Sequence, residues 1–189
     1  MGEKADNRLP ELREVVKEQD RRVYNFCEYM LYEPALVAPL VIKVFAEFGR
    51  VYRRLESQTA PMSDDELRIR LFQVAWTFIQ RHLAAQEHNL HLGRDTRDLK
   101  NFGRDLLTGA NADEAQVREQ IFQRILSLDA DLRAPVVLRD ILKFNDEQTM
   151  QILGMRWGVY RHRLNRGRLD FANYLRGRLV SNSDSEATV

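Results

Sequence analysis

Residues 145–168 read NDEQTMQILGMRWGVYRHRLNRGR, and their spacing is that of two helices separated by a tight turn. Asn145 can cap a short helix of about two turns, with Gln148 as the other member of a capping box. Gly154 follows, where a tight turn needs a residue that tolerates a positive φ. A longer helix then begins near Trp157. A short helix, a glycine-containing turn and a longer helix form the layout of a helix-turn-helix.

The second helix of this pair is strongly basic. Between residues 150 and 180 there are seven arginines and one acidic residue, Asp170, although the net charge of the whole chain is only +1. A helix fits the major groove of duplex DNA, where arginine can bind guanine edges or phosphates. A basic helix that docks on an acidic protein partner is the alternative interpretation. The residues that we expect to contact DNA are Arg156, Trp157, Arg161, His162, Arg163, Arg166 and Arg168.

Helical spacing of apolar residues continues through the rest of the chain, and the alternation and hairpin turns of strands are missing. Ser63 and Glu66 are spaced as a capping box before a broadly apolar helix. We expect Pro39 in the first turn of the preceding helix. The sequence therefore predicts an all-α fold with two small helical lobes, the C-terminal one a helix-turn-helix. The expected segments are a first lobe over residues 10–90, a linker over 91–117, a second lobe over 118–178 and a disordered tail over 179–189.

Other functional classes find little support. Because the chain has no Gly-rich phosphate loop and no nucleophile motif, we expect a binding protein that is not an enzyme and uses no cofactor. His82, His88 and His91 lie close together but lack further ligands, so we expect no metal site. The chain has one cysteine, Cys27, no signal-peptide core and no apolar run of bilayer length. These features predict a cytoplasmic protein with no membrane and no small-molecule partner.

The second half of the chain resembles domain four of the RNA polymerase sigma factors, and the closest group is the small two-domain, extracytoplasmic-function type. The resemblance rests on residues 128–175, LDADLRAPVVLRDILKFNDEQTMQILGMRWGVYRHRLNRGRLDFANYL. The first half is similar to domain two of the same family. There the polymerase-binding helix corresponds to residues 36–48, LVAPLVIKVFAEF, and the promoter-melting helix to residues 70–82, RLFQVAWTFIQRH. The resemblance implies promoter recognition together with RNA polymerase.

Some positions depart from the pattern of that family. Its polymerase-binding helix usually carries acidic and amide side chains where this chain has Pro39, Ile42 and Lys43, so carboxylates that would pair with a basic polymerase surface are missing. Thr77 stands where the melting helix usually has an Asn. By position, the resemblance implies polymerase or partner binding by Pro39, Ile42, Lys43 and Phe45. It implies promoter melting by Arg70, Gln73, Trp76, Thr77 and Arg81.

The sequence therefore predicts a divergent, sigma-like transcription regulator. Its expected partners are double-stranded DNA, bound by the C-terminal module, and RNA polymerase core or an anti-sigma-like regulator, bound by the first lobe. One alternative is a sigma mimic that sequesters an anti-sigma factor or another regulatory protein without ordinary promoter recognition. Another is a separate helix-turn-helix regulator that dimerises through the first lobe. Binding of polymerase core in solution separates the first interpretation from the other two.

Overall fold

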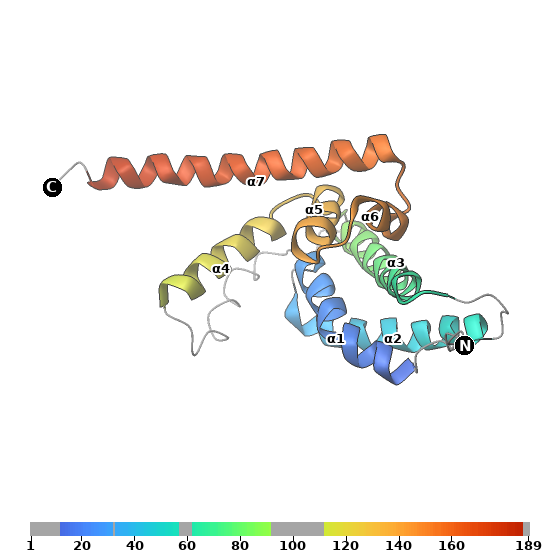
Figure 1. Cartoon of the computed structure of the whole chain (residues 1–189). Helices are drawn as coiled ribbons and strands as arrows, with labels where there is room; N and C mark the ends of the chain where they lie inside the picture. The colour runs from blue at the N-terminus through green and yellow to red at the C-terminus, as the bar shows by residue number, and fades with distance from the viewer. Residues whose placement is uncertain (1–11, 32, 57–61, 92–111, 187–189) are drawn as a thin grey trace, which may run out of the picture.

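The computed structural model describes residues 12–31, 33–56, 62–91 and 112–186, and this part of the chain contains helices and no strand (Figure 1). The all-α prediction is therefore confirmed. None of these helices has a stretch that is both long and apolar enough to cross a bilayer. In chain order the elements are α1 (Leu12–Met30), α2 (Pro34–Glu56), α3 (Asp64–His91), α4 (Ala112–Leu126), α5 (Ala130–Val136), the π-helical turn η2 (Val137–Ile141), α6 (Asp146–Leu153) and α7 (Trp157–Glu186).

The starts of α3 and α6 are fixed by reciprocal hydrogen bonds between side chain and backbone. The Glu66 amide donates to Ser63 Oγ over 3.3 Å, and the Glu66 carboxylate accepts from the Ser63 amide over 2.8 Å. At α6 the Gln148 amide donates to Asn145 Oδ1 over 2.8 Å, and Gln148 Oε1 accepts from the Asn145 amide over 3.0 Å. Both predicted capping boxes are confirmed, and each gives partners to N–H groups at a helix start.

Helix α2 begins earlier than expected. It starts at Pro34, so Pro39 lies inside the helix rather than in its first turn. Pro34 occupies the first helical position, which suits proline because the missing N–H has no partner there in any helix. The missing N–H of Pro39 leaves the carbonyl of Ala35 without its helical donor, but both residues are exposed and water can reach that carbonyl.

Two further boundaries differ from the expected ones. Helix α4 begins at Ala112, inside the expected linker, while residues 92–111 lie outside the described part of the chain. Helix α7 continues to Glu186, through residues 179–186 that the sequence analysis assigns to a disordered tail. These residues contain no proline or glycine, and each residue added to an existing helix gains a backbone hydrogen bond.

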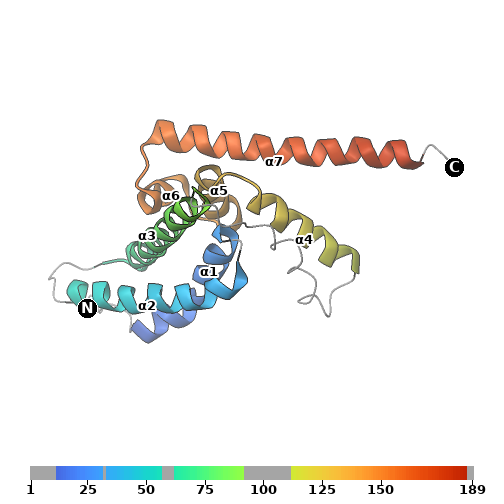
Figure 2. The same ribbon diagram turned by 180° about the vertical axis from the view of Figure 1, so that it is seen from behind.

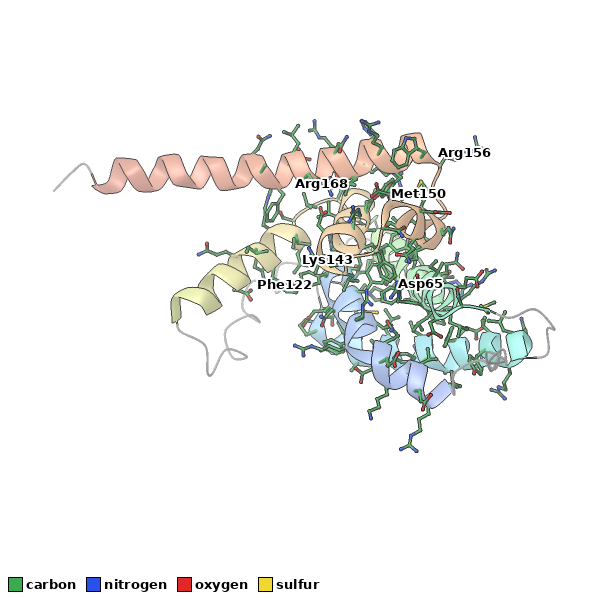
Figure 3. The ribbon with its side chains drawn as sticks, viewed as in Figure 1. Asp65, Phe122, Lys143, Met150, Arg156 and Arg168 are labelled. Carbon is green, nitrogen blue, oxygen red and sulfur yellow. The ribbon has the colours of Figure 1, made fainter. Side chains whose placement is uncertain are left out.

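The two expected lobes pack against each other. Buried side chains of α1, α2 and α3 form one continuous cluster with those of α5, η2 and α6. Phe144, which is fully buried, lies at the centre of this junction and packs edge-on against Phe72 of α3, with 4.7 Å between the ring centroids. The guanidinium groups of Arg22 and Arg68 lie 5.1 and 5.2 Å from the centre of the Phe144 ring. Lys143, labelled in Figure 3, precedes Phe144 in the chain and has a positive φ of 61°, which makes the turn into Phe144 sharp.

Long-range hydrogen bonds to backbone carbonyls support the junction. Arg22 Nη2 donates to the carbonyl of Leu142 over 2.6 Å. Arg133 Nη1 donates over 3.0 Å to the carbonyl of Met30, the last residue of α1, where helix carbonyls lack an internal donor. Burial lowers the pKa of Arg133 to about 10, so this guanidinium stays charged near neutral pH. The first and second halves of the chain are thus joined by both apolar and polar contacts.

Helices α2 and α7 lie on opposite sides of the molecule in both views (Figures 1 and 2). The first half of α7 packs on α5, while its C-terminal end projects past the body of the protein (Figure 1). The close approach to α5 depends on Gly167. A Cβ atom there would lie 2.9 Å from the carbonyl oxygen of Leu132 and from Cγ2 of Val136.

We predict that Phe144→Ala lowers the stability of the whole protein. Truncating a buried Phe costs about 3–5 kcal/mol, which corresponds to roughly 6–20 °C in the thermal midpoint of a protein of this size. Phe144→Leu, which keeps most of the apolar volume, should cost clearly less. Thermal and urea unfolding followed by circular dichroism measure both effects. A Phe144→Ala variant as stable as the parent would contradict the central position of this ring.

Candidate nucleic-acid interface

A left-handed residue at the end of α6 connects it to α7. Gly154 has φ 64° and ψ 32°, which confirms the predicted positive φ. The amide of Met155 then donates to the carbonyl of Met150 over 3.1 Å and closes the turn. On the other side of the turn, Tyr160 and Leu164 of α7 are buried against Val136 of α5 in a second, small apolar cluster. The first part of α7 is therefore held against both α5 and α6.

A carboxylate fixes how α7 is rotated about its axis. Asp146, the first residue of α6, accepts a hydrogen bond of 2.7 Å from the Tyr160 hydroxyl and one of 2.6 Å from Arg139 Nε. These bonds, that from Tyr160 first, lower the pKa of Asp146. Burial, followed by the bond to Asp146, raises the pKa of Tyr160. Tyr160 therefore stays protonated and points inward, which turns the opposite side of α7 towards solvent.

Two of the residues expected to contact DNA instead bind carboxylates of the protein itself. Arg163 Nη2 lies 2.6 Å from Asp131 of α5. Arg168 forms a bidentate pair with Asp140 of η2, at 2.9 Å through Nε and 2.6 Å through Nη2. The bond to Asp140 raises the pKa of Arg168. Arg163 and Arg168 therefore fasten α7 to the body of the protein.

The side chains of the other residues expected to contact DNA remain accessible at the start of α7 and along it. Trp157 is 51% exposed, and the guanidinium carbon of Arg161 lies 6.0 Å from the centre of its ring. Arg156 is exposed at the start of α7 (Figure 3), and His162 is exposed as well. Arg166 is exposed and pairs with the half-buried Asp170, one turn along the helix, at 3.2 Å. The structure thus brings these five residues to the accessible part of the helix.

The outward side of α7 also carries residues that the sequence analysis did not select. Val159, Asn165 and Leu169 are exposed there. Asn165 lies four positions from Arg161 and three from His162, Leu169 lies seven positions from His162, and Val159 lies three positions before His162, so each shares a side of the helix with one of these residues. The apolar spacing in the sequence predicts Val159 on the core-facing side of this helix, but it is 47% exposed, and neither charge nor motif distinguishes Asn165 and Leu169 in the sequence.

The expected promoter-melting residues divide between two sides of α3. Arg70, Thr77 and Arg81 are exposed. Gln73 lies beside them and donates from Nε2 to the carbonyl of Gln151 in α6 over 2.8 Å. Trp76, which the resemblance assigns to promoter melting, is instead buried, with its ring centre 6.4 Å from that of Phe26 in α1. In this arrangement Trp76 has no exposed ring face on which a base could stack.

The expected partner-binding residues lie on α2. Ile42 is 69% exposed, and Pro39 and Lys43 beside it are exposed too. Phe45 is half-buried and packs against the core. Together these neighbouring side chains give α2 an accessible apolar surface, and contiguous apolar surface of this kind is typical of protein-binding sites.

Comparison with known proteins gives matches to solved structures, and none to family models or to curated sequences. The sigma factor RpoE of Bartonella quintana, solved in complex with the anti-sigma factor NepR, matches with a TM-score of 0.66 at 13% identity, over 89% of this chain and 98% of RpoE. CnrH, solved in complex with the cytosolic domain of CnrY, matches with a TM-score of 0.57 at 15% identity, over 88% of each chain. The chain has the fold of these proteins, which confirms the sigma-factor resemblance at the level of the fold.

We predict that Gly154→Ala destabilises the protein by about 1–2 kcal/mol, the cost of a left-handed conformation for a residue with a Cβ. No heavy atom lies within 4 Å of the position of that Cβ, so the loss comes from the backbone alone. Gly158→Ala is the matched control, because that position is equally open but helical. It should raise stability by about 0.5–1 kcal/mol. Chemical unfolding measures both, and changes of the same sign would contradict the turn geometry.

Proposed function

We propose that the chain is a sigma-like transcription regulator that binds duplex DNA through the outward side of α7. In this role α6 and α7 form the helix-turn-helix, with α7 as the helix that enters the major groove. The protein acts by binding and carries out no reaction of its own. Its other partner is RNA polymerase core or an anti-sigma-like regulator, bound through the exposed surface of α2.

The accessible basic side of α7 carries this proposal. Arg156, Arg161 and Arg166 can reach phosphates or guanine edges without breaking any contact that holds the fold, apart from the exposed pair of Arg166. Their charge is concentrated on one helix of a nearly neutral chain, which is the distribution expected for binding an anionic polymer. The fold shared with a sigma factor supports a transcriptional role for this surface.

The surface of α2 supports the second partner. RpoE was solved in complex with an anti-sigma factor, and CnrH with the cytosolic domain of CnrY, so two proteins of this fold form complexes with another protein. Here α2 offers Ile42 and Pro39 as an exposed apolar patch, with Lys43 beside them. Such a patch is suited to burial against another protein.

The second candidate function is that of a sigma mimic. Three observations favour it over an ordinary sigma factor. Lys43 stands where the resembled helix is acidic or amidic, Trp76 is buried, and Gln73 is bonded to α6. A mimic would use the α2 surface to hold a regulator and would melt no promoter. Dimerisation of a separate regulator has no comparable support, and gel filtration of the purified protein tests it.

The first experiment compares two pairs of arginines on the same helix. Arg161→Ala with Arg166→Ala removes outward charges, and we expect weaker duplex binding. Each lost phosphate contact should reduce the slope of log affinity against log salt by about 0.9. Fluorescence anisotropy with a labelled duplex over a salt series measures this change.

The matched control removes the same charge from the two arginines of α7 that pair with carboxylates of α5 and η2. Arg163→Ala with Arg168→Ala breaks the pairs with Asp131 and Asp140, each worth less than about 1 kcal/mol because the side chains are partly exposed. We expect lower thermal stability and an unchanged salt slope for the folded protein. Equal changes in slope from the two pairs, or none from either, would reject α7 as the DNA-binding helix.

The second experiment concerns the α2 surface. We predict weak binding to RNA polymerase core from the same organism, because Lys43 repels a basic surface and Ile42 offers no hydrogen bond to it. Lys43→Glu should strengthen the binding to polymerase core. Lys17→Glu, at an exposed position of α1, should leave that binding unchanged. Gel filtration measures binding and run-off transcription measures promoter opening. Robust transcription by the unmodified chain with core alone would contradict the prediction.

A further inference from the structure

The outward side of α7 has a regular stripe of exposed residues. Gly158, His162, Asn165 and Leu169 follow one another at steps of three or four residues, Arg161 lies four residues before Asn165, and all five are exposed. Asn165 lies in the middle, one turn after Arg161 and one turn before Leu169. A residue in the middle of an exposed helix face is the one that approaches the groove floor when the helix lies in DNA.

No feature of the fold accounts for Asn165. Its side chain makes no hydrogen bond to any described residue, in contrast to Asn145, which caps α6. Asn is also among the poorer helix formers, because its amide competes with the backbone for hydrogen bonds. A solvent-facing position inside a long helix favours residues such as Ala, Glu or Lys. Asn165 therefore reduces helix stability without a compensating contact inside the protein.

The chemistry of the stripe distinguishes Asn165 from its neighbours. Arginine has donors alone, so Arg161 and Arg166 match guanine O6 and N7 or phosphate oxygens. Asn165 presents a donor and an acceptor side by side, which matches N7 and the N6 amino group of adenine in the major groove. Leu169, one turn further along, offers an apolar surface of the kind that contacts the thymine methyl group.

We infer that Asn165 is a base-reading residue of α7 and that it selects adenine at one position of the bound duplex. The inference rests on the proposed function, because it requires α7 to lie in the major groove. Arg161 and Arg166 lie on its two flanks, and they orient the helix by contacts to phosphates or guanine. Asn165 then supplies discrimination between base pairs, while contributing little to binding that is independent of sequence.

The test is selection of duplexes from a randomised pool by the full chain, followed by affinity measurements on the selected duplex and its single-base variants. We expect the unmodified protein to prefer adenine at one position by about 5- to 150-fold, the range for one good bidentate contact. Asn165→Ala should abolish that preference and leave the salt slope unchanged. Asn165→Gln, which keeps the amide, should retain part of it. Asn173→Ala is the matched control, because Asn173 is an exposed Asn two turns further along the same helix.

The outcomes separate this inference from the proposed function. An adenine preference that survives in Asn165→Ala, or one that Asn173→Ala removes equally, overturns the assignment of Asn165 alone. Selection that finds no preferred base, with duplex binding intact, also overturns it while leaving DNA binding in place. Absence of duplex binding by the unmodified protein overturns the proposed function itself.

Discussion

Burial of Phe144 is the contact on which the arrangement of the helices depends. Its ring is contributed by the short segment between η2 and α6, yet its neighbours Arg22, Arg68 and Phe72 all belong to the first half of the chain. Without it, α6 would lose its support on α3, and the hydrogen bond of Gln73 to α6 would lose its alignment. Two arginines beside one ring also repel each other, and this repulsion contributes to a lowered pKa of Arg22, whose larger cause is burial.

A second constraint acts on α7. Carboxylates from α5, η2 and α6 hold this strongly basic helix: Asp131 pairs with Arg163, Asp140 pairs with Arg168, and Asp146 accepts a hydrogen bond from Tyr160. The arginines of α7 are thereby divided into those that fasten the helix and those that remain accessible. The chain is nearly neutral overall, but the exposed Arg156, Arg161 and Arg166 still give α7 a basic surface.

Local signals in the sequence predicted much of this structure. Capping residues at Ser63 and Asn145 and the positive φ of Gly154 depend on neighbouring residues alone, so they could be read directly. The sigma-factor resemblance predicted the order of the helices. The buried position of Trp76 agrees with the usual packing of an aromatic residue on a broadly apolar helix, whereas its partner Phe26 lies on another helix and could not be predicted from neighbouring residues. The pairing of Arg168 with Asp140 likewise depends on a contact between residues far apart in the chain.

The position of α2 and α7 on opposite sides of the molecule has a thermodynamic consequence (Figures 1 and 2). A partner on one helix does not collide with a ligand on the other, so both can be bound to the same molecule. Any effect of one on the affinity for the other has to be transmitted through the junction around Phe144. Linkage requires such an effect to be reciprocal: a regulator that weakens DNA binding by some factor is itself held more weakly, by that same factor, when DNA is bound.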